Sequence, residues 1–207
     1  MTSDAYAALA AADEVLARLL DEHGRPEQRP PAGDAYTALV RAIVGQQLSV
    51  TAARTIYTRL LDHFGGHAPT PEEILAADPE AMRAAAGLSR AKTTFLRSLA
   101  EHVASGRLDF GRIGELSDPE LVAELTAVKG VGEWTAHMFM LFELRRPDVL
   151  AVGDLGIRRA VERAYALPDL PSAAELTELA EPWAPHRSAA CLLLWHSLTG
   201  QPVDVLS

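Results

Sequence analysis

The stretch LTAVKGVGEWTA, residues 125–136, decides the fold that the sequence predicts. Leu125 and Val128 form an apolar face before a Gly-x-Gly turn at Gly130 and Gly132, and a second helical pattern follows. Glycine at these two positions permits positive φ and leaves the main-chain amides unobstructed by side chains. The exposed amides at the start of the second helix can hold a phosphate. The stretch therefore predicts a helix-hairpin-helix motif with an anion-binding turn.

Outward from this motif, apolar residues recur at helical spacing along most of the chain, and little supports strands. The sequence therefore predicts an all-α protein, with helical patterns at 6–20, 36–48, 52–64, 94–103, 119–128, 134–144, 155–167 and 189–198. Pro71 and Pro79 mark two further short helices. The expected N-caps are Asp34, Ser49, Ser89, Asp118, Asp154 and Ser172, and the expected stops are Gly24, Gly65, Gly66, Gly87, Gly106 and Gly200. The proline-containing segment 24–33 is the expected linker.

The composition indicates a globular protein. The chain has 207 residues, of which 48% are hydrophobic, enough for a substantial core. The single cysteine, Cys191, lies in an apolar run, so we expect it to be buried packing. The first twenty residues lack a basic start and a long apolar core, and no long apolar run appears elsewhere. We expect a cytoplasmic protein with no membrane association.

The charge balance weighs against nucleic-acid binding, because 19 Lys and Arg face 28 Asp and Glu, a formal net charge of −9. Ten basic residues nevertheless lie near the segments that carry motifs: Arg41, Arg54, Arg59, Arg90, Lys92, Arg97, Lys129, Arg158, Arg159 and Arg187. Helix N-termini and hairpin amides also hold phosphate without adding net charge. A local basic face is therefore compatible with the acidic total.

Four further blocks accompany the hairpin: AIVGQQLS (42–49), AGLSRAK (86–92), VGDLGIRR (152–159) and WAPHRS (183–188). With these blocks the chain resembles the helix-hairpin-helix DNA glycosylases, most closely the 3-methyladenine DNA glycosylase II branch, over residues 36–198. The resemblance implies two helical subdomains on either side of a cleft. One subdomain would span approximately 37–150 and contain the hairpin, and the other would combine 1–36 with 151–207, together forming one glycosylase unit over 1–207. The implied partner is double-stranded DNA with alkylated bases, bound by a monomer that associates with the nucleoid.

Asp154 is the residue to which we assign the chemistry. It is also an ordinary helix N-cap, and the two roles are compatible. Cleavage of an N-glycosidic bond develops positive charge on the deoxyribose as the base departs, and a fixed anion stabilises that charge more than the ground state. Asp154 could also orient the attacking water. A second, acidic carboxyl is not evident, and His137 and His186 fit structural roles better than an acid's role.

The missing acid favours substrates that already carry positive charge. A purine alkylated at N3 or N7 departs as a neutral base and needs no protonation, as with 3-methyladenine and 7-methylguanine. Aromatic faces attract a cation by about 2 kcal/mol when desolvated. The candidate pocket residues are Trp134, Trp183 and Tyr36, whereas Trp195, inside an apolar run, fits core packing better.

Position 134 bears on the type of reaction. In the related bifunctional glycosylases, which resemble endonuclease III, a lysine follows the hairpin at this place and forms a Schiff base with the sugar. Here the residue is Trp134, and Lys129 precedes the hairpin glycines and would point toward phosphate. We therefore expect a monofunctional hydrolase that leaves an abasic site. The alternatives are a glycosylase with lyase activity and a non-catalytic helix-hairpin-helix module that only binds DNA.

The resemblance also implies residues that contact DNA. Flipping a nucleotide leaves a gap in the stack that a side chain must fill, and Gln46 or Gln47 fits by family position, although an amide that bonds helix carbonyls is an equal alternative. Leu88 or Ser89 could wedge the opposite strand. Gly130, Gly132, Thr135 and Lys129 would hold phosphate. No cofactor is required, but family members bind a monovalent cation, Na⁺ or K⁺, which by position would contact the main-chain carbonyls of Thr126, Val128 and Val131.

Overall fold

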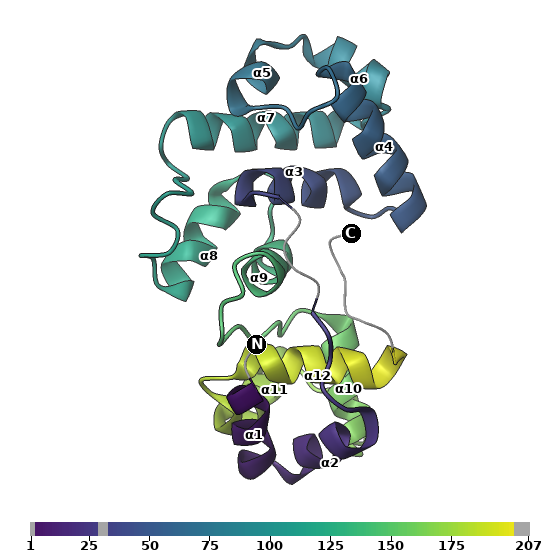
Figure 1. Cartoon of the computed structure of the whole chain (residues 1–207), viewed down its shortest axis with the longest axis vertical. Helices are drawn as coiled ribbons and strands as arrows, with labels where there is room; N and C mark the ends of the chain where they lie inside the picture. Colours follow the sequence, from purple (N-terminus) through teal and green to yellow (C-terminus); the bar gives the residue numbers. More distant parts are fainter. Residues whose placement is uncertain (1–2, 29–32, 201–207) are drawn as a thin grey trace. The chain divides into compact units, whose positions relative to one another are not determined.

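The computed structural model describes residues 3–28 and 33–200, and over these residues it contains helices and turns but no strand, which confirms the all-α prediction. No helix in the described part of the chain is long and apolar enough to cross a membrane. In chain order the elements are α1 (Ser3–Ala12), α2 (Glu14–His23), α3 (Ala35–Gly45), α4 (Val50–His63), α5 (Pro71–Ala76), α6 (Pro79–Ala86), α7 (Arg90–Ala104), α8 (Asp118–Ala127), α9 (Glu133–Phe142), α10 (Leu155–Ala164), α11 (Ala173–Leu179), the 3-10 helix η1 (Glu181–Trp183) and α12 (Arg187–Thr199) (Figure 1).

Side-chain caps begin most of these helices, as the sequence predicts. The predicted caps that accept a bond from the first turn of their helix are Asp34, Ser49, Ser89, Asp154 and Ser172. The sixth prediction is wrong by one residue, because Ser117 is the N-cap of α8 and Asp118 is its first residue. Ser117 and Glu120 form a capping box, and the adjacent aspartate adds negative charge at the same helix start.

Glycines end several helices. Gly87 and Gly200 are C-caps in the left-handed conformation, and Gly24 caps α2 at a φ of 73°. The C-caps of α4 and α7 are Phe64 and Ser105, each one residue before a predicted glycine. The predicted linker 24–33 falls partly on residues 29–32, which lie outside the described part of the chain.

The pattern over residues 6–20 is divided into two helices rather than one. Asp13 interrupts it in an extended conformation, and its Oδ1 accepts bonds from the amides of Val15 and Leu16 at 2.9 and 3.1 Å. Its Oδ2 accepts bonds from the Tyr165 hydroxyl and from Trp183 Nε1. Periodicity alone misses this break because the apolar spacing continues across it.

The described chain separates into two compact units, each with its own internal contacts. The hairpin unit contains residues 33–139, and the aspartate unit contains residues 3–28 and 140–200. The second division lies ahead of the predicted boundary at 150, because the loop after α9 bonds to the start of α12. There Ser188 Oγ donates to the carbonyl of Arg146 at 2.6 Å and accepts from the amide of Val149 at 2.9 Å.

In the hairpin unit α7 packs against α3, α5 and α6, and α4 packs against α3 and α6 (Figure 1). Its core is aliphatic, with Leu39, Ile43, Leu60, Leu96 and Leu99 fully buried. The packing fixes the end of α3 and the start of α7, which carry two of the motifs named above.

In the aspartate unit α12 is the central helix, packed against α1, α2 and α10. Every residue from Ser188 to Trp195 is buried, as expected of a helix that is apolar all round. Cys191 is free and fully buried, as predicted, and burial raises the pKa of its thiol to about 12. This helix therefore serves as the fixed support for α10 and for the residue at its start.

Candidate active site and helix-hairpin-helix motif

The hairpin forms as the sequence predicts. The helix α8 ends at Ala127, the amide of Val131 donates to the carbonyl of Val128 at 3.0 Å, and α9 starts at Glu133. Val131 is buried at 4% exposure, so it anchors the turn in the core. The carbonyl of Gly132 accepts the first bond of α9, from the amide of Ala136, which makes this glycine the N-cap. The first amides of α9 therefore follow an N-cap that has no side chain of its own to bond them.

The two glycines are needed for different reasons. Gly130 has a φ of 88°, and a Cβ built there would overlap the ring of Phe95 on α7. Gly132 lies outside the left-handed region, and a Cβ there would meet nothing within 4 Å. The positive φ that glycine permits at both positions is used at Gly130, whereas at Gly132 glycine serves to leave space open.

The two adjacent glutamines after α3 have separate environments. Gln46 donates its side-chain amide to the carbonyl of Gly130 at 2.8 Å and so ties the end of α3 to the hairpin. Gln47 is exposed and has a φ of 57°, a conformation that side chains rarely adopt. Strain of this kind in a non-glycine residue is concentrated at functional sites. Of the two glutamines, Gln47 is the one whose side chain is exposed for a ligand.

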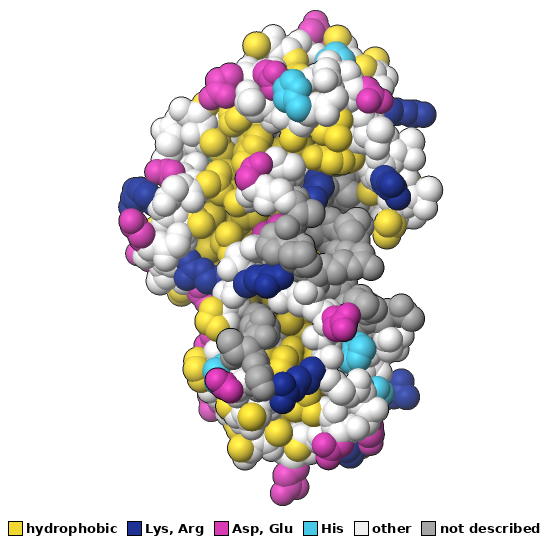
Figure 2. Space-filling model, in the orientation of Figure 1, with side chains coloured by type: hydrophobic (Ala, Val, Ile, Leu, Met, Phe, Trp, Pro, Cys, Tyr) yellow, Lys and Arg dark blue, Asp and Glu magenta, His cyan; other side chains and the backbone are white. Residues whose placement is uncertain are grey.

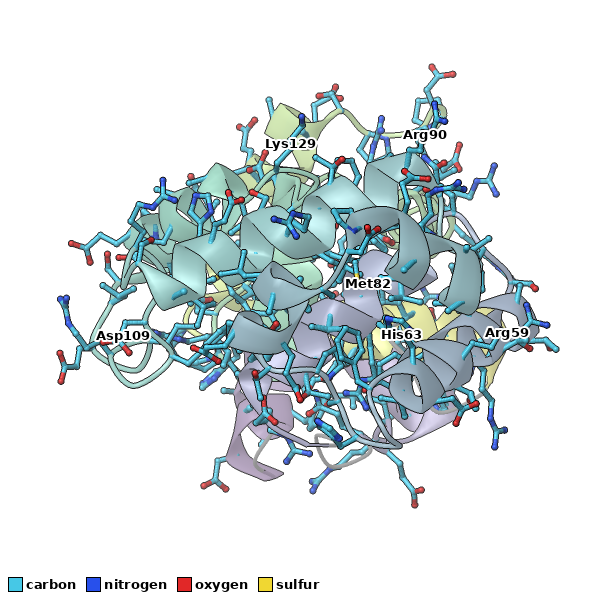
Figure 3. All side chains as sticks on the ribbon, turned by 90° about the horizontal axis from the view of Figure 1, so that it is seen from above. Arg59, His63, Met82, Arg90, Asp109 and Lys129 are labelled. Carbon is cyan, nitrogen blue, oxygen red and sulfur yellow. The ribbon has the colours of Figure 1, made fainter. Side chains whose placement is uncertain are left out.

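The other residues predicted to contact DNA differ in their exposure to solvent. Lys129 is exposed, its amide bonds the hydroxyl of Ser98 at 3.0 Å, and in Figure 3 it lies on the same side of the view as Arg90. Ser89 is exposed and caps α7. Thr135 is 6% exposed, so only its main chain can serve a phosphate. The wedge role predicted for Leu88 is wrong, because Leu88 is 3% exposed and packs into the core.

Asp154 lies at the N-terminus of α10 in the aspartate unit. Its Oδ1 accepts a bond from the amide of Ile157 at 2.8 Å, which confirms the N-cap role. The same oxygen accepts a second bond, at 2.8 Å, from the indole Nε1 of Trp195. The side chain is half-buried. A carboxylate is thus held at a helix N-terminus, where the helix dipole favours negative charge.

Trp195 differs from its predicted role as core packing alone. Its ring is 7% exposed and stacks on Phe142 at 5.7 Å between centroids, with 29° between the planes. Its one polar atom is directed at Asp154 from 41 residues further along the chain. The sequence offers no local signal for this contact, because α12 is apolar on every face.

The three predicted pocket residues have different exposures. Trp134, in the first turn of α9, is 40% exposed. Tyr36 is half-buried, its ring meets Phe110 edge to face at 6.2 Å, and its buried hydroxyl has no hydrogen-bond partner among the described residues. Trp183 is fully buried, and its Nε1 donates to Asp13 at 2.8 Å. This is a core position, which corrects the pocket role predicted for Trp183.

The carbonyls named for a cation lie at the end of α8 and in the turn. Thr126 is in the last turn of α8, where carbonyls have no partner within the helix, and Val128 and Val131 belong to the same turn. Neutral carbonyl oxygens together with the negative end of a helix dipole suit a monovalent cation. Within residues 3–28 and 33–200 no group of three His, Cys, Asp or Glu side chains is placed to hold a metal. A monovalent cation at this position would therefore be held by main-chain oxygens.

Basic side chains are dispersed over the face drawn in Figure 2, with acidic ones between them, rather than gathered in one continuous patch. This pattern agrees with the net charge of −9. Any anion bound here would rely on main-chain amides and a few local cations more than on the overall field.

Residues 40–185 match the family model described as HhH-GPD superfamily base excision DNA repair protein, and the chain belongs to this family. It is 38% identical over 191 residues to DNA-3-methyladenine glycosylase 1 of Schizosaccharomyces pombe, covering 90% of this chain and 83% of that protein. These matches confirm the resemblance seen in the sequence.

Solved structures with a similar fold support the same family. A DNA-3-methyladenine glycosidase from Bacillus halodurans superimposes with a TM-score of 0.87 at 36% identity, covering 96% of this chain and 91% of that one. The 3-methyladenine DNA glycosylase of Schizosaccharomyces pombe, solved in complex with abasic DNA, gives 0.80 at 37% identity, covering 94% and 96%. An endonuclease III complex at 17% identity shares the fold alone.

Sequence reasoning also missed two exposed apolar residues that follow α3. Leu48 and Val50 flank the N-cap of α4 and are 38% and 63% exposed, although both are apolar. Leu48 follows Gln47 directly and Val50 is the first residue of α4, so the connection from α3 to α4 presents apolar side chains to solvent. The predicted helical pattern 36–48 includes Leu48, but α3 ends at Gly45 and Leu48 lies in the short loop before α4.

Proposed function

We propose that this protein is a monofunctional DNA glycosylase that hydrolyses the N-glycosidic bond of alkylated, cationic purines such as 3-methyladenine and 7-methylguanine in base excision repair. The observation that carries the proposal is the carboxylate of Asp154, held by two donors at the start of α10 in a member of this repair family. The names of its relatives support the substrate class.

Asp154 would act on the sugar rather than on the base. As the glycosidic bond breaks, positive charge develops at C1′ of the deoxyribose, and the nearby carboxylate stabilises it. Water then adds its oxygen to C1′ and loses a proton, leaving an abasic site and a free base. This is the role of the stabilising carboxylate in other glycoside hydrolyses, without a partner acid.

A substrate that carries its own positive charge removes the need for a general acid. Burial lowers the pKa of His137, one turn after Trp134 on α9, more than the nearby Glu133 and Asp118 raise it. A neutral imidazole is a poor proton donor. A neutral purine would therefore leave slowly, whereas a base alkylated at N3 or N7 departs unaided.

Trp134 and Tyr36 are the aromatic candidates for selecting a cationic base. The exposed indole of Trp134 offers a ring face, and cation–π attraction rises from about 0.5 kcal/mol to about 2 kcal/mol as the pair is desolvated. Burial raises the pKa of Tyr36, so its hydroxyl stays protonated and can donate a bond to a ligand. Trp134 also occupies the place of the lyase lysine, which favours hydrolysis by water.

The hairpin would hold the DNA backbone. The amides at the start of α9 bind a phosphate, with Gly132 leaving the approach open and Lys129 adding local charge. Gln47 would fill the gap left by the flipped nucleotide, because it is exposed whereas Gln46 is bonded to Gly130. The carbonyls of Thr126, Val128 and Val131 would hold Na⁺ or K⁺ beside that phosphate, where the ion offsets its charge.

The test is base release from methylated double-stranded DNA. We expect free 3-methyladenine and 7-methylguanine without strand nicking. Replacing Asp154 with Asn should slow release at least about a hundredfold while affinity for DNA with an abasic-site analogue is kept, because the charge is lost and the shape is not. The matched control is Asp169→Asn, which changes an exposed aspartate after α10 in the same unit and should keep full activity.

Three outcomes would contradict the proposal. Wild-type turnover by Asp154→Asn would remove the catalytic assignment. Release accompanied by nicking, with an adduct that borohydride traps, would identify a lyase. Binding without release on every lesion would identify a DNA-binding module.

A further inference from the structure

We propose that Trp195 is a positioning residue for the reaction, which fixes the catalytic oxygen of Asp154 through its indole N–H. The inference rests on the function proposed above and adds a residue to it. Oδ1 of Asp154 accepts two hydrogen bonds of 2.8 Å, one from the amide of Ile157 within α10 and one from Nε1 of Trp195 on α12.

The bond from Trp195 restricts the carboxylate of Asp154 more than the N-cap bond alone does. A single amide bond fixes one contact of the carboxylate and leaves it free to turn about its side-chain bonds, as N-caps at exposed helix ends do. A second donor from another helix fixes Oδ1 from a second direction. The position of the charge is then set by the packing of α12 on α10 rather than by the local turn.

The donor itself is rigid. The Trp195 ring is nearly buried and stacks on Phe142 at the end of α9, so it cannot turn away without losing that contact. The residues that precede it in α12, from Ser188 to Leu194, are also buried. A rigid donor lets the enzyme hold the charge in place before the reaction, so that little reorganisation is needed when positive charge develops on the sugar.

Gly156 makes room for this contact. A Cβ at position 156 would lie 3.0 Å from Oδ1 of Asp154, 3.1 Å from Nε1 of Trp195 and 3.2 Å from its Cδ1. Its φ is not in the left-handed region, so the backbone itself does not require glycine. The absence of a side chain at the second residue of α10 therefore serves the approach of the indole to the carboxylate.

The experiment separates chemistry from binding and from folding. Trp195→Phe keeps an aromatic ring against Phe142 and removes the N–H. We expect the single-turnover rate of 7-methylguanine release to fall about tenfold to a hundredfold, the range for a lost bond to a charged group, with unchanged affinity for abasic-analogue DNA. A residue that only packs the core would alter the melting temperature and leave the rate of the folded fraction unchanged.

Trp183→Phe is the matched control. It removes the same N–H from a tryptophan of the same unit that bonds an aspartate distant in sequence, Asp13, at the same 2.8 Å. It should lower the melting temperature and leave the release rate as it was. Gly156→Ala is the second variant, because it crowds the Asp154–Trp195 bond with both partners present. We expect a severalfold lower rate together with normal DNA affinity.

The outcomes are distinguishable. Wild-type rates in both Trp195→Phe and Gly156→Ala, alongside an inactive Asp154→Asn, would overturn the role of Trp195 and leave the proposed function intact. Equal losses of rate in Trp195→Phe and Trp183→Phe would also overturn it, because the effect would then be structural. An active Asp154→Asn would remove the catalytic role of Asp154 and the positioning role with it.

Discussion

The helices α9 and α10 start in the same way but differ in what their N-caps carry. Each begins at an N-cap whose carbonyl accepts the first bond of the helix, Gly132 for α9 and Asp154 for α10. At α10 the cap's own carboxylate bonds the amide of Ile157 and so places a negative charge at the helix start. At α9 the cap has no side chain that could bond the first amides.

In the proposed function, one local structure binds a phosphate or presents a carboxylate, depending on whether the cap carries a side chain. The starts of the two helices are also held in place by different contacts. The main chain of Gly130 fixes the hairpin, because it lies against the Phe95 ring and accepts a bond from the Gln46 side chain. Side-chain bonding fixes Asp154, through Trp195. We therefore expect substitutions at the hairpin to change stability or affinity, and those around Asp154 to change the rate.

The largest expected effect is at Gly130. Gly130→Ala should reduce the free energy of unfolding by about 3 kcal/mol, because a side chain at a φ of 88° is strained and would also overlap Phe95. Chemical denaturation measures the change. Gly132→Ala is the control, with open space around it, and should be close to wild type in stability. Equal stability of the two variants would show that the hairpin is not fixed by this contact.

The next effect tests whether the empty cap is what binds DNA. Gly132→Asp gives α9 the cap of α10, and the new carboxylate would occupy the amides and repel phosphate. Affinity for double-stranded DNA should fall about a hundredfold, while stability changes by a few tenths of a kcal/mol. Fluorescence anisotropy measures the affinity, and Gly132→Asn separates charge from size. Undiminished affinity in Gly132→Asp would exclude the α9 amides as a phosphate site.

The smallest expected effect is on the pH dependence of the stability of the aspartate unit. Asp148 bonds Arg187 through two oxygens, at 2.8 and 2.6 Å, and so ties the loop after α9 to α12. Burial acts to raise the pKa of Asp148, but the bonds from the Arg187 side chain and amide outweigh it, and the pKa is lowered from its ordinary value of 3.8. A lowered pKa in the folded state stabilises the fold above the ordinary value, and the contribution is lost as pH falls through the lowered pKa.

Asp148→Asn should therefore cost about 1–2 kcal/mol at neutral pH and less as the pH drops below 3.8, where the wild type loses the same contribution. Thermal unfolding as a function of pH measures the difference. A gap between variant and wild type that stays constant down to pH 2 would show that the charge of Asp148 does not stabilise the unit.

Much of the site could be predicted from local sequence because it depends on short-range bonding. The N-cap role of Asp154 and the turn at Gly130 follow from spacing within a few residues. The predictions that were wrong concern tertiary packing. Leu88 and Trp183 belong to motif blocks, but the packing of the described chain buries both. Membership of a motif does not tell whether a side chain faces a ligand or the core.

By itself the sequence determined most of the helices, most of their caps and the family of this protein, because hydrophobic period, capping and glycine conformation act over one or two turns of chain. Only the tertiary structure decided that Gln46 is bonded while Gln47 is exposed, and that Trp195 reaches Asp154 past Gly156. Those outcomes depend on how helices pack against one another. In a helix as apolar on all faces as α12, the sequence does not mark which face meets which neighbour.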